Sequence, residues 1–170
     1  QVEMDIASST AQRRIAIKLG CSRKTVARKV VFLAQQAREN TAAWLARCAP
    51  FEHLQWDELI TFEHTRLKPL SVAVMVCTDS RSIVGHGVAQ LPASGLIAKR
   101  SREKYGLRIN RSGQMRRKLL GELSKHVAPN ATIESDEHPK YREEIKAALP
   151  NVNHIQYRSV RGSLTGQGEL

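Results

Sequence analysis

The sequence predicts an α/β protein in which a helical amino-terminal part is followed by a mixed β-sheet. Residues 12–30 carry apolar side chains at helical spacing, whereas residues 53–63 alternate between apolar and polar side chains, as half-buried strands do. A chain of 170 residues that is 41% apolar can bury one sizeable core and a small additional module. We therefore expect residues 1–50 and residues 51–170 to form separate domains.

The formal charge of +11 is unevenly distributed and points to a polyanionic partner. Residues 1–50 carry nine Lys/Arg against three Asp/Glu, and residues 95–126 carry ten against two, while the intervening segments lean acidic. No apolar run approaches the ~18 residues of a membrane span, and no signal peptide precedes the first helix. The three cysteines form no Cys-x-x-Cys pair, which disfavours a zinc ribbon. These features predict a cytoplasmic protein with reduced thiols.

Residues 12–30 match the mechanical needs of a helix-turn-helix. Ala16 allows two helices to approach, Gly20 suits the turn and Val26 buries in the pair, while Ile15 and Leu19 supply the first helix's inner face. Ser22 is a natural N-cap for the second helix, and residues 39–50 are expected to form a short connecting helix and linker. An ordinary basic helical hairpin is the alternative. The side chains expected to contact DNA from the opening turns are Arg23, Lys24, Thr25, Arg28 and Lys29.

The remaining elements follow the order strand, strand, strand, helix, strand, helix, strand. Alternating or continuous apolar patterns predict the three initial strands, and the later elements begin with an apolar helical stripe. This order is that of a ribonuclease H-like fold, in which the first strand lies beside the fourth. The expected ranges are strands 53–63, 70–77 and 82–91, helix 114–127, strand 131–135, a helix opened by Pro139, and strand 154–157.

Asp57 and Asp136 end up on neighbouring strands in such a sheet, about 4.8 Å apart. A carboxylate on an apolar strand needs a hydrogen bond, a counter-charge or a cation, so the pair predicts a site for one divalent ion. Because successive strand residues point to opposite faces, Asp57 is preferred over Glu58, and Asp136 over Glu137. Glu58 is then either a contact on the other face or a residue supporting the site. Glu137 suits a helix start, and His138 suits a helix cap or a phosphate contact.

Two further features complete the candidate site. Glu169 is the only acid after Glu144 and is the candidate third carboxylate, although an exposed terminal residue is the alternative. Because the chain begins with Gln1 and stops at Leu170, we expect a fragment that lacks part of the site. A basic segment between the third strand and the next helix is expected to strap over DNA, with Tyr105 stacking on it, or else to be a disordered loop. The side chains expected to contact phosphates there are Lys99, Arg100, Arg102, Lys104 and Arg108.

These motifs resemble the bacterial insertion-sequence DDE transposases, particularly small ones with a helix-turn-helix before the catalytic core. The likeness is carried by the stretches around residues 25–28, 56–59, 104–108, 135–141 and 166–170. It implies that Asp57 and Asp136 are the first two acids of the catalytic triad and that Mg²⁺ or Mn²⁺ is the cofactor. It also implies terminal inverted repeats and target DNA as substrates, and we expect a homodimer or higher oligomer on DNA. A non-catalytic transcriptional regulator and a nuclease or resolvase of the same fold are the alternatives.

Overall fold

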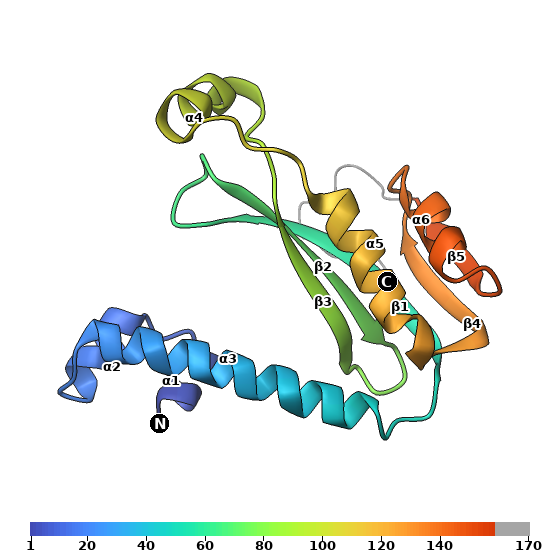
Figure 1. Ribbon diagram of the computed structural model, residues 1–170, viewed down its shortest axis with the longest axis horizontal. Helices are drawn as coiled ribbons and strands as arrows, with labels where there is room; N and C mark the ends of the chain where they lie inside the picture. The colour runs from blue at the N-terminus through green and yellow to red at the C-terminus, as the bar shows by residue number, and fades with distance from the viewer. Residues whose placement is uncertain (159–170) are drawn as a thin grey trace. The chain divides into compact units, whose positions relative to one another are not determined.

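The computed structural model describes residues 1–158 and has a mixed α/β architecture. Within these residues lie six α-helices and one mixed sheet of five strands (Figure 1). The chain divides into two compact units, one from Gln1 to Cys48 and a second that begins at Ala49. The division falls close to the expected boundary at residue 50. None of the helices in residues 1–158 has the length and apolar character required to cross a membrane.

The first unit consists of α1 (Val2–Ala7), α2 (Gln12–Lys18) and α3 (Arg23–Leu45). Its buried core is made by Ile15, Ala16 and Val26, as expected, with other apolar side chains packed around them. The buried Asp5 carboxylate ties α1 to α2, because its Oδ1 accepts a hydrogen bond from Lys18 Nζ at 2.7 Å. This hydrogen bond is the main cause that lowers the pKa of Asp5.

The connection between α2 and α3 follows the sequence-based expectation at two positions. Gly20 has a φ of +61°, the left-handed region that glycine adopts without steric cost. Ser22 caps α3, since its Oγ accepts the Thr25 backbone N–H at 3.1 Å. The expectation for Leu19 was wrong: its side chain is 39% exposed, because α2 ends at Lys18 and Leu19 belongs to the turn.

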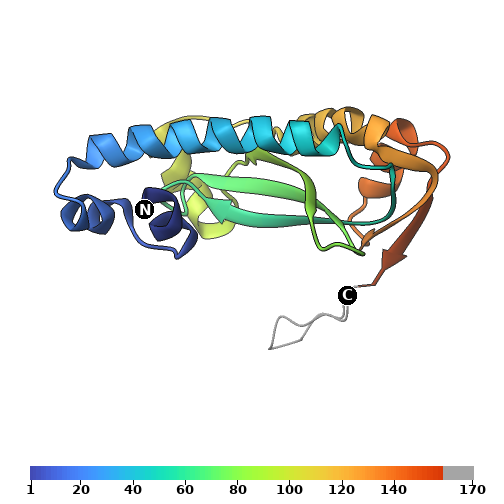
Figure 2. The ribbon, with the colours of Figure 1, turned by 90° about the horizontal axis from the view of Figure 1, so that it is seen from below.

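Helix α3 is longer than the sequence analysis expected. Residues 39–50 were expected to form a separate connecting helix, but α3 runs without interruption from Arg23 to Leu45 (Figure 2). No glycine or proline occurs between these two residues, so nothing in the sequence breaks the helix.

The second unit is built on a five-stranded sheet with the order β3-β2-β1-β4-β5. Its strands β1 and β2 are antiparallel, as are β2 and β3, whereas β4 runs parallel to β1 and β5 parallel to β4. The expected three antiparallel strands and the expected pairing of the first strand with the fourth are therefore confirmed. The bounds are β1 (Phe51–Phe62), β2 (Pro69–Cys77), β3 (Ile83–Gln90), β4 (Val127–Asp136) and β5 (Asn153–Tyr157).

One face of this sheet is packed against α5 (Ser112–Leu123) and α6 (Tyr141–Ala148). We call it the helix-covered face; from β1 it receives the buried Leu54 and Trp56. The Trp56 ring lies edge-on to the ring of Tyr141 from α6, with centroids 6.0 Å apart. Glycine on β3 lets α5 approach, because a Cβ at Gly85 would lie 2.7 Å from Leu123 Cδ1. The opposite face, which carries Asp57, we call the aspartate face.

The basic segment after β3, expected to strap over DNA or else to be a disordered loop, contains a helix. After a short 3₁₀ turn, α4 (Ala98–Tyr105) forms. Two contacts anchor it to the turn between β1 and β2: Ser101 Oγ donates to the Leu67 carbonyl oxygen at 2.7 Å, and the Tyr105 ring lies edge-on to His64 at 6.2 Å. Tyr105, expected to stack on DNA, therefore contacts the protein itself.

Candidate functional site

Asp57 and Asp136 lie at neighbouring positions of two parallel strands. The parallel pairing of β1 with β4 runs to Trp56 opposite Ser135, and the two aspartates follow one residue later on their strands. Trp56 and Ser135 are buried on the helix-covered face, so strand alternation directs both aspartates to the opposite face. Both side chains are exposed there. Two carboxylates from distant parts of the sequence thus occupy adjacent strands about 4.8 Å apart.

Local hydrogen bonds orient the two carboxylates and leave oxygen lone pairs free to coordinate a cation. Oδ1 of Asp57 accepts the backbone N–H of Glu58 at 2.7 Å. Oδ1 of Asp136 accepts the backbone N–H of His138 at 3.2 Å, which fixes the chain as it leaves β4. Each bond engages one oxygen of a group with about four lone-pair sites, so both carboxylates can still coordinate a cation.

The aspartate face also carries Gln55, Glu134 and Tyr157, which the sequence analysis did not assign to the site. Gln55 lies two residues before Asp57, and Glu134 two residues before Asp136. Glu134 accepts hydrogen bonds from Gln55 Nε2 at 3.2 Å and from the Tyr157 hydroxyl at 3.0 Å, so both of its oxygens are engaged. The bond to Glu134 raises the pKa of Tyr157. The period-two spacing on each strand was the signal that could have revealed them.

The donor set on the aspartate face is compatible with a small hard cation. Mg²⁺ is commonly held by one or two carboxylates and completes its coordination with water and substrate phosphates, which matches an exposed aspartate pair. Within residues 1–158 no group of three or more His, Cys, Asp or Glu side chains is placed to hold a metal ion. Glu169, the candidate third acid, lies outside the described residues.

The neighbouring acids have different surroundings, as strand alternation requires. Glu58 points to the helix-covered face, where Arg116 Nη1 lies 2.9 Å from its Oε2, so the expected contact on the other face is confirmed. Glu137 is exposed and precedes α6 by several residues; it is not in the helix's first turn as expected. His138 Nδ1 accepts the Lys140 backbone N–H at 3.2 Å, a turn contact before the helix.

In the first unit, the candidate DNA contacts line the opening turns of α3. Arg23, Lys24, Arg28 and Lys29 are all exposed on this helix. The Thr25 hydroxyl is 2.9 Å from Ser22 Oγ and so also takes part in the helix cap. The cap therefore orients the turn from which these cations project.

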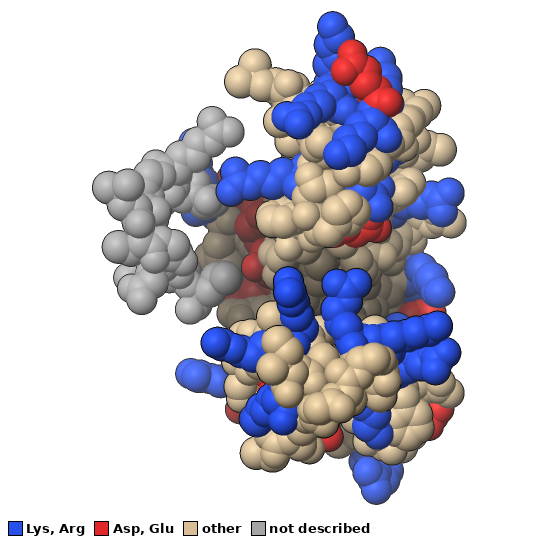
Figure 3. Space-filling view, turned by 90° about the vertical axis from the view of Figure 1, so that its left-hand side faces the viewer, with Lys and Arg blue, Asp and Glu red and all other residues tan. Residues whose placement is uncertain are grey.

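In the second unit, α4 presents the other group of candidate contacts. Lys99, Arg100, Arg102 and Lys104 are exposed, and Figure 3 shows Lys and Arg side chains gathered at the α4 end, at the top of the view. Arg108 differs, because it is partly buried and donates to the carbonyl oxygens of Leu91 at 3.1 Å and Pro69 at 3.3 Å. Its guanidinium holds the ends of β2 and β3, a structural role that the sequence did not indicate.

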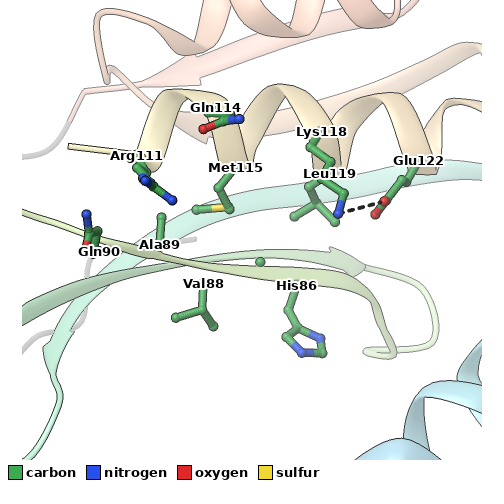
Figure 4. Close-up of a pocket in the computed structure, with 11 residues that line it drawn as sticks. His86, Val88, Ala89, Gln90, Arg111, Gln114, Met115, Lys118, Leu119 and Glu122 are labelled. Atoms are coloured by element: carbon green, nitrogen blue, oxygen red, sulfur yellow. Dashed lines mark ion pairs between the residues drawn. The ribbon is translucent and has the colours of Figure 1, made fainter. Parts of the chain in front are cut away.

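A cavity of about 450 Å³ lies between α5 and β3 at the edge of the sheet (Figure 4). Met115 and Leu119 point from the helix toward the strand, while His86 and Val88 point to the other side. Lys118 and Glu122 form an ion pair of 3.7 Å on its outer wall. The cavity is on the helix-covered face and two strands away from β1, so it is separate from the aspartate pair.

Compared with known proteins, the chain matches no protein-family model and no curated protein. A proposal of function therefore depends on the geometry of the aspartate face, on the basic helices and on the sequence motifs.

Proposed function

We propose that this chain is a transposase of the insertion-sequence type, which binds terminal inverted repeats and catalyses metal-dependent cleavage and transfer of DNA strands. The observation that carries the proposal is the adjacent placement of Asp57 and Asp136 on parallel strands, exposed on the same face. The strand order β3-β2-β1-β4-β5 agrees with the ribonuclease H-like core that the proposal requires. The resemblance of the motifs to DDE transposases supplies the specific reaction.

Asp57 and Asp136 are the residues that would hold Mg²⁺ or Mn²⁺. A divalent cation bound there would activate water or a DNA 3′-hydroxyl and stabilise the leaving oxygen. The chain's own contribution is to present both carboxylates from a rigid sheet, each oriented by a backbone N–H. Glu169 stays the candidate third acid of this site.

The basic helices supply the proposed DNA contacts. The first unit would act as a helix-turn-helix, with Arg23, Lys24 and Arg28 at the start of α3 reaching bases and phosphates. The four exposed cations of α4 would contact phosphates near the reacting strand. Acting on paired inverted repeats, the protein is proposed to work as a homodimer or higher oligomer.

The central test is strand transfer in Mg²⁺ or Mn²⁺ with labelled DNA that carries the terminal inverted repeats which the proposal requires. Asp57→Asn and Asp136→Asn should each lower joined products more than about 100-fold, beyond the usual effect of losing a partner of a metal ligand. Both variants should still bind the DNA in a mobility-shift assay. Because the side chains are exposed, folding stability should change by no more than about 0.5 kcal/mol.

Asp79→Asn is the matched control, since Asp79 is another exposed aspartate and lies in the turn after β2. It should leave strand transfer unchanged. Unaltered cleavage by Asp57→Asn would remove the catalytic assignment. DNA binding without any cleavage by the wild-type protein would favour a DNA-binding regulator. Cut ends without joined products, lost in the same variant, would instead favour a nuclease or resolvase that uses the same carboxylates.

A further inference from the structure

A buried ion cluster lies directly behind the aspartate pair, on the helix-covered face. Arg116 of α5 has a side chain that is 5% exposed. Its Nε and Nη2 donate to the two carboxylate oxygens of Glu144 from α6 at 2.6 and 3.0 Å. Its Nη1 donates to Glu58 of β1 at 2.9 Å. One guanidinium therefore joins three elements of the second unit.

Glu58 is the point at which this cluster reaches β1. Its carboxylate also accepts hydrogen bonds from Ser71 Oγ on β2 and from the Tyr141 hydroxyl on α6, the latter at 3.3 Å. The partly buried carboxylate is thus held by three donors on three different elements. Holding Glu58 on one face fixes the preceding residue, Asp57, on the other, because alternation leaves a strand residue no choice of side.

The same cluster reaches Asp136 through α6. Tyr141 is stacked on His138, with ring centroids 4.5 Å apart. The backbone N–H of His138 is the donor that orients Asp136 Oδ1. Contacts therefore run from Arg116 to both aspartates, through Glu58 on one side and through Tyr141 and His138 on the other.

The chemistry of the cluster favours a geometric role over a stabilising one. Buried ion pairs are often no more stabilising than well-packed apolar side chains of similar volume, because desolvation offsets the attraction. A planar guanidinium adds direction, because its N–H groups form a fork that is fixed in one plane and donate hydrogen bonds only in set directions. Burial opposes the charge, but Glu144 and Glu58 outweigh it and raise the pKa of Arg116, so the fork stays charged.

We propose that Arg116 is a positioning residue for the cation-binding aspartates, and that it sets the separation of Asp57 and Asp136 by fixing Glu58 and α6. This inference rests on the proposed function. Without the Arg116 guanidinium, Glu58 and α6 would lose the hydrogen bonds that it donates to them, and the carboxylates of Asp57 and Asp136 could shift relative to each other. Divalent-cation affinity would then fall, as it does when partners of metal ligands are removed elsewhere.

The test measures Mn²⁺ binding to the 170-residue protein by electron paramagnetic resonance, without DNA and without catalysis. Arg116→Lys keeps the charge but loses the fork, and Arg116→Met removes both. We expect Mn²⁺ affinity to fall roughly 10-fold to 100-fold in Arg116→Met, with a smaller loss in Arg116→Lys. Circular dichroism sets a temperature at which every variant is folded; should Arg116→Met not fold, Arg116→Lys decides the outcome.

Two controls separate positioning from general loss of stability. Leu119→Ala removes a buried apolar side chain from the same helix, so it should destabilise the unit while leaving Mn²⁺ affinity within about twofold. Asp57→Asn tests the site itself and should abolish binding. Equal Mn²⁺ affinities for the wild type and Asp57→Asn would overturn the proposed function. Binding that depends on Asp57 but is unchanged in the Arg116 variants would overturn the positioning role alone.

Discussion

Asp57 and Glu58 are consecutive acids on one strand, yet the two faces of the sheet give them opposite surroundings. Glu58 is paired with the buried Arg116 at 2.9 Å and accepts two further hydrogen bonds. Asp57 is exposed on the other face and accepts the adjacent backbone N–H. The difference teaches that strand alternation can separate an acid that organises the fold from one that is available to an external cation.

The physical basis of the difference is solvation. A carboxylate removed from water must be paired or hydrogen-bonded, and loss of its partner leaves an uncompensated buried charge. An exposed carboxylate is stabilised by water, and a cation can replace part of that water. Substitutions on the helix-covered face should therefore affect folding first, whereas those on the aspartate face should affect chemistry first.

The largest expected effect on folding is that of Arg116→Met. Removing this cation leaves Glu58 without its counter-charge and leaves Glu144 with only the exposed Arg117, 3.6 Å away, which should lower the free energy of unfolding by about 3–5 kcal/mol. The adjacent Arg117 is the control: its side chain is 64% exposed, so Arg117→Met should cost less than about 0.5 kcal/mol. Urea denaturation measures both. Equally small losses of unfolding free energy in the two variants would mean that Arg116 does not compensate buried carboxylates.

A smaller effect is expected where α5 approaches β3 on the same face. In Gly85→Ala the new Cβ would lie 2.7 Å from Leu123 Cδ1 and 3.2 Å from Leu119 Cδ1, so these side chains or the helix that carries them must shift, at a cost of about 1–3 kcal/mol. In Gly121→Ala nothing lies within 4 Å of the new Cβ, and alanine in a helix should stabilise by up to about 1 kcal/mol. Thermal denaturation should thus give opposite signs for these two substitutions; a stabilising Gly85→Ala would contradict the packing.

The smallest expected effect is a pH dependence that arises from His154 on β5. Burial, with a further contribution from the charge of Arg142, lowers the pKa of His154 below its ordinary value of 6.5. The unfolded chain therefore takes up this proton near pH 6.5, whereas the folded chain takes it up only at lower pH. The contribution of the neutral His154 to the free energy of unfolding is fully present above that range and is lost as the pH falls through it.

Melting temperatures between about pH 8 and pH 5 test this dependence, because a histidine changes its charge in that interval. The curve of His154→Gln should fall less steeply than that of the wild type. Glutamine can keep a donor for Ser135 Oγ, which lies 2.9 Å from His154 Nε2. Parallel curves for the two proteins would show that His154 does not contribute to the slope.

Much of the sheet could be predicted because its signals are local. Alternation along β1, the apolar run of β2 and the short run before Asp136 predicted the strands themselves, and the pairing that brings the two aspartates together was inferred from the order of the elements. The turn after α2 was predicted equally well, since Gly20 and Ser22 act within a few residues of themselves. Alternation also separated Asp57 from Glu58 correctly.

What the sequence could not reveal depends on distant partners. Arg116 stands in the run Arg116-Arg117-Lys118 and reads as one more surface cation of a basic segment. Only the fold brings Glu58 and Glu144, 58 and 28 positions away, to its guanidinium. The contacts of Arg108 were hidden for the same reason, because the carbonyl oxygens that it contacts belong to strand ends far away in the sequence.

The burial of Trp56 has a practical consequence for studying this protein. Its indole is 2% exposed and lies one residue from Asp57, edge-on to Tyr141. Its fluorescence should therefore have the short emission wavelength of an apolar environment and respond to paramagnetic or heavy ions that approach the aspartate face. The chain contains two tryptophans, so replacing Trp44 by phenylalanine would leave a single intrinsic optical reporter beside the candidate cation site.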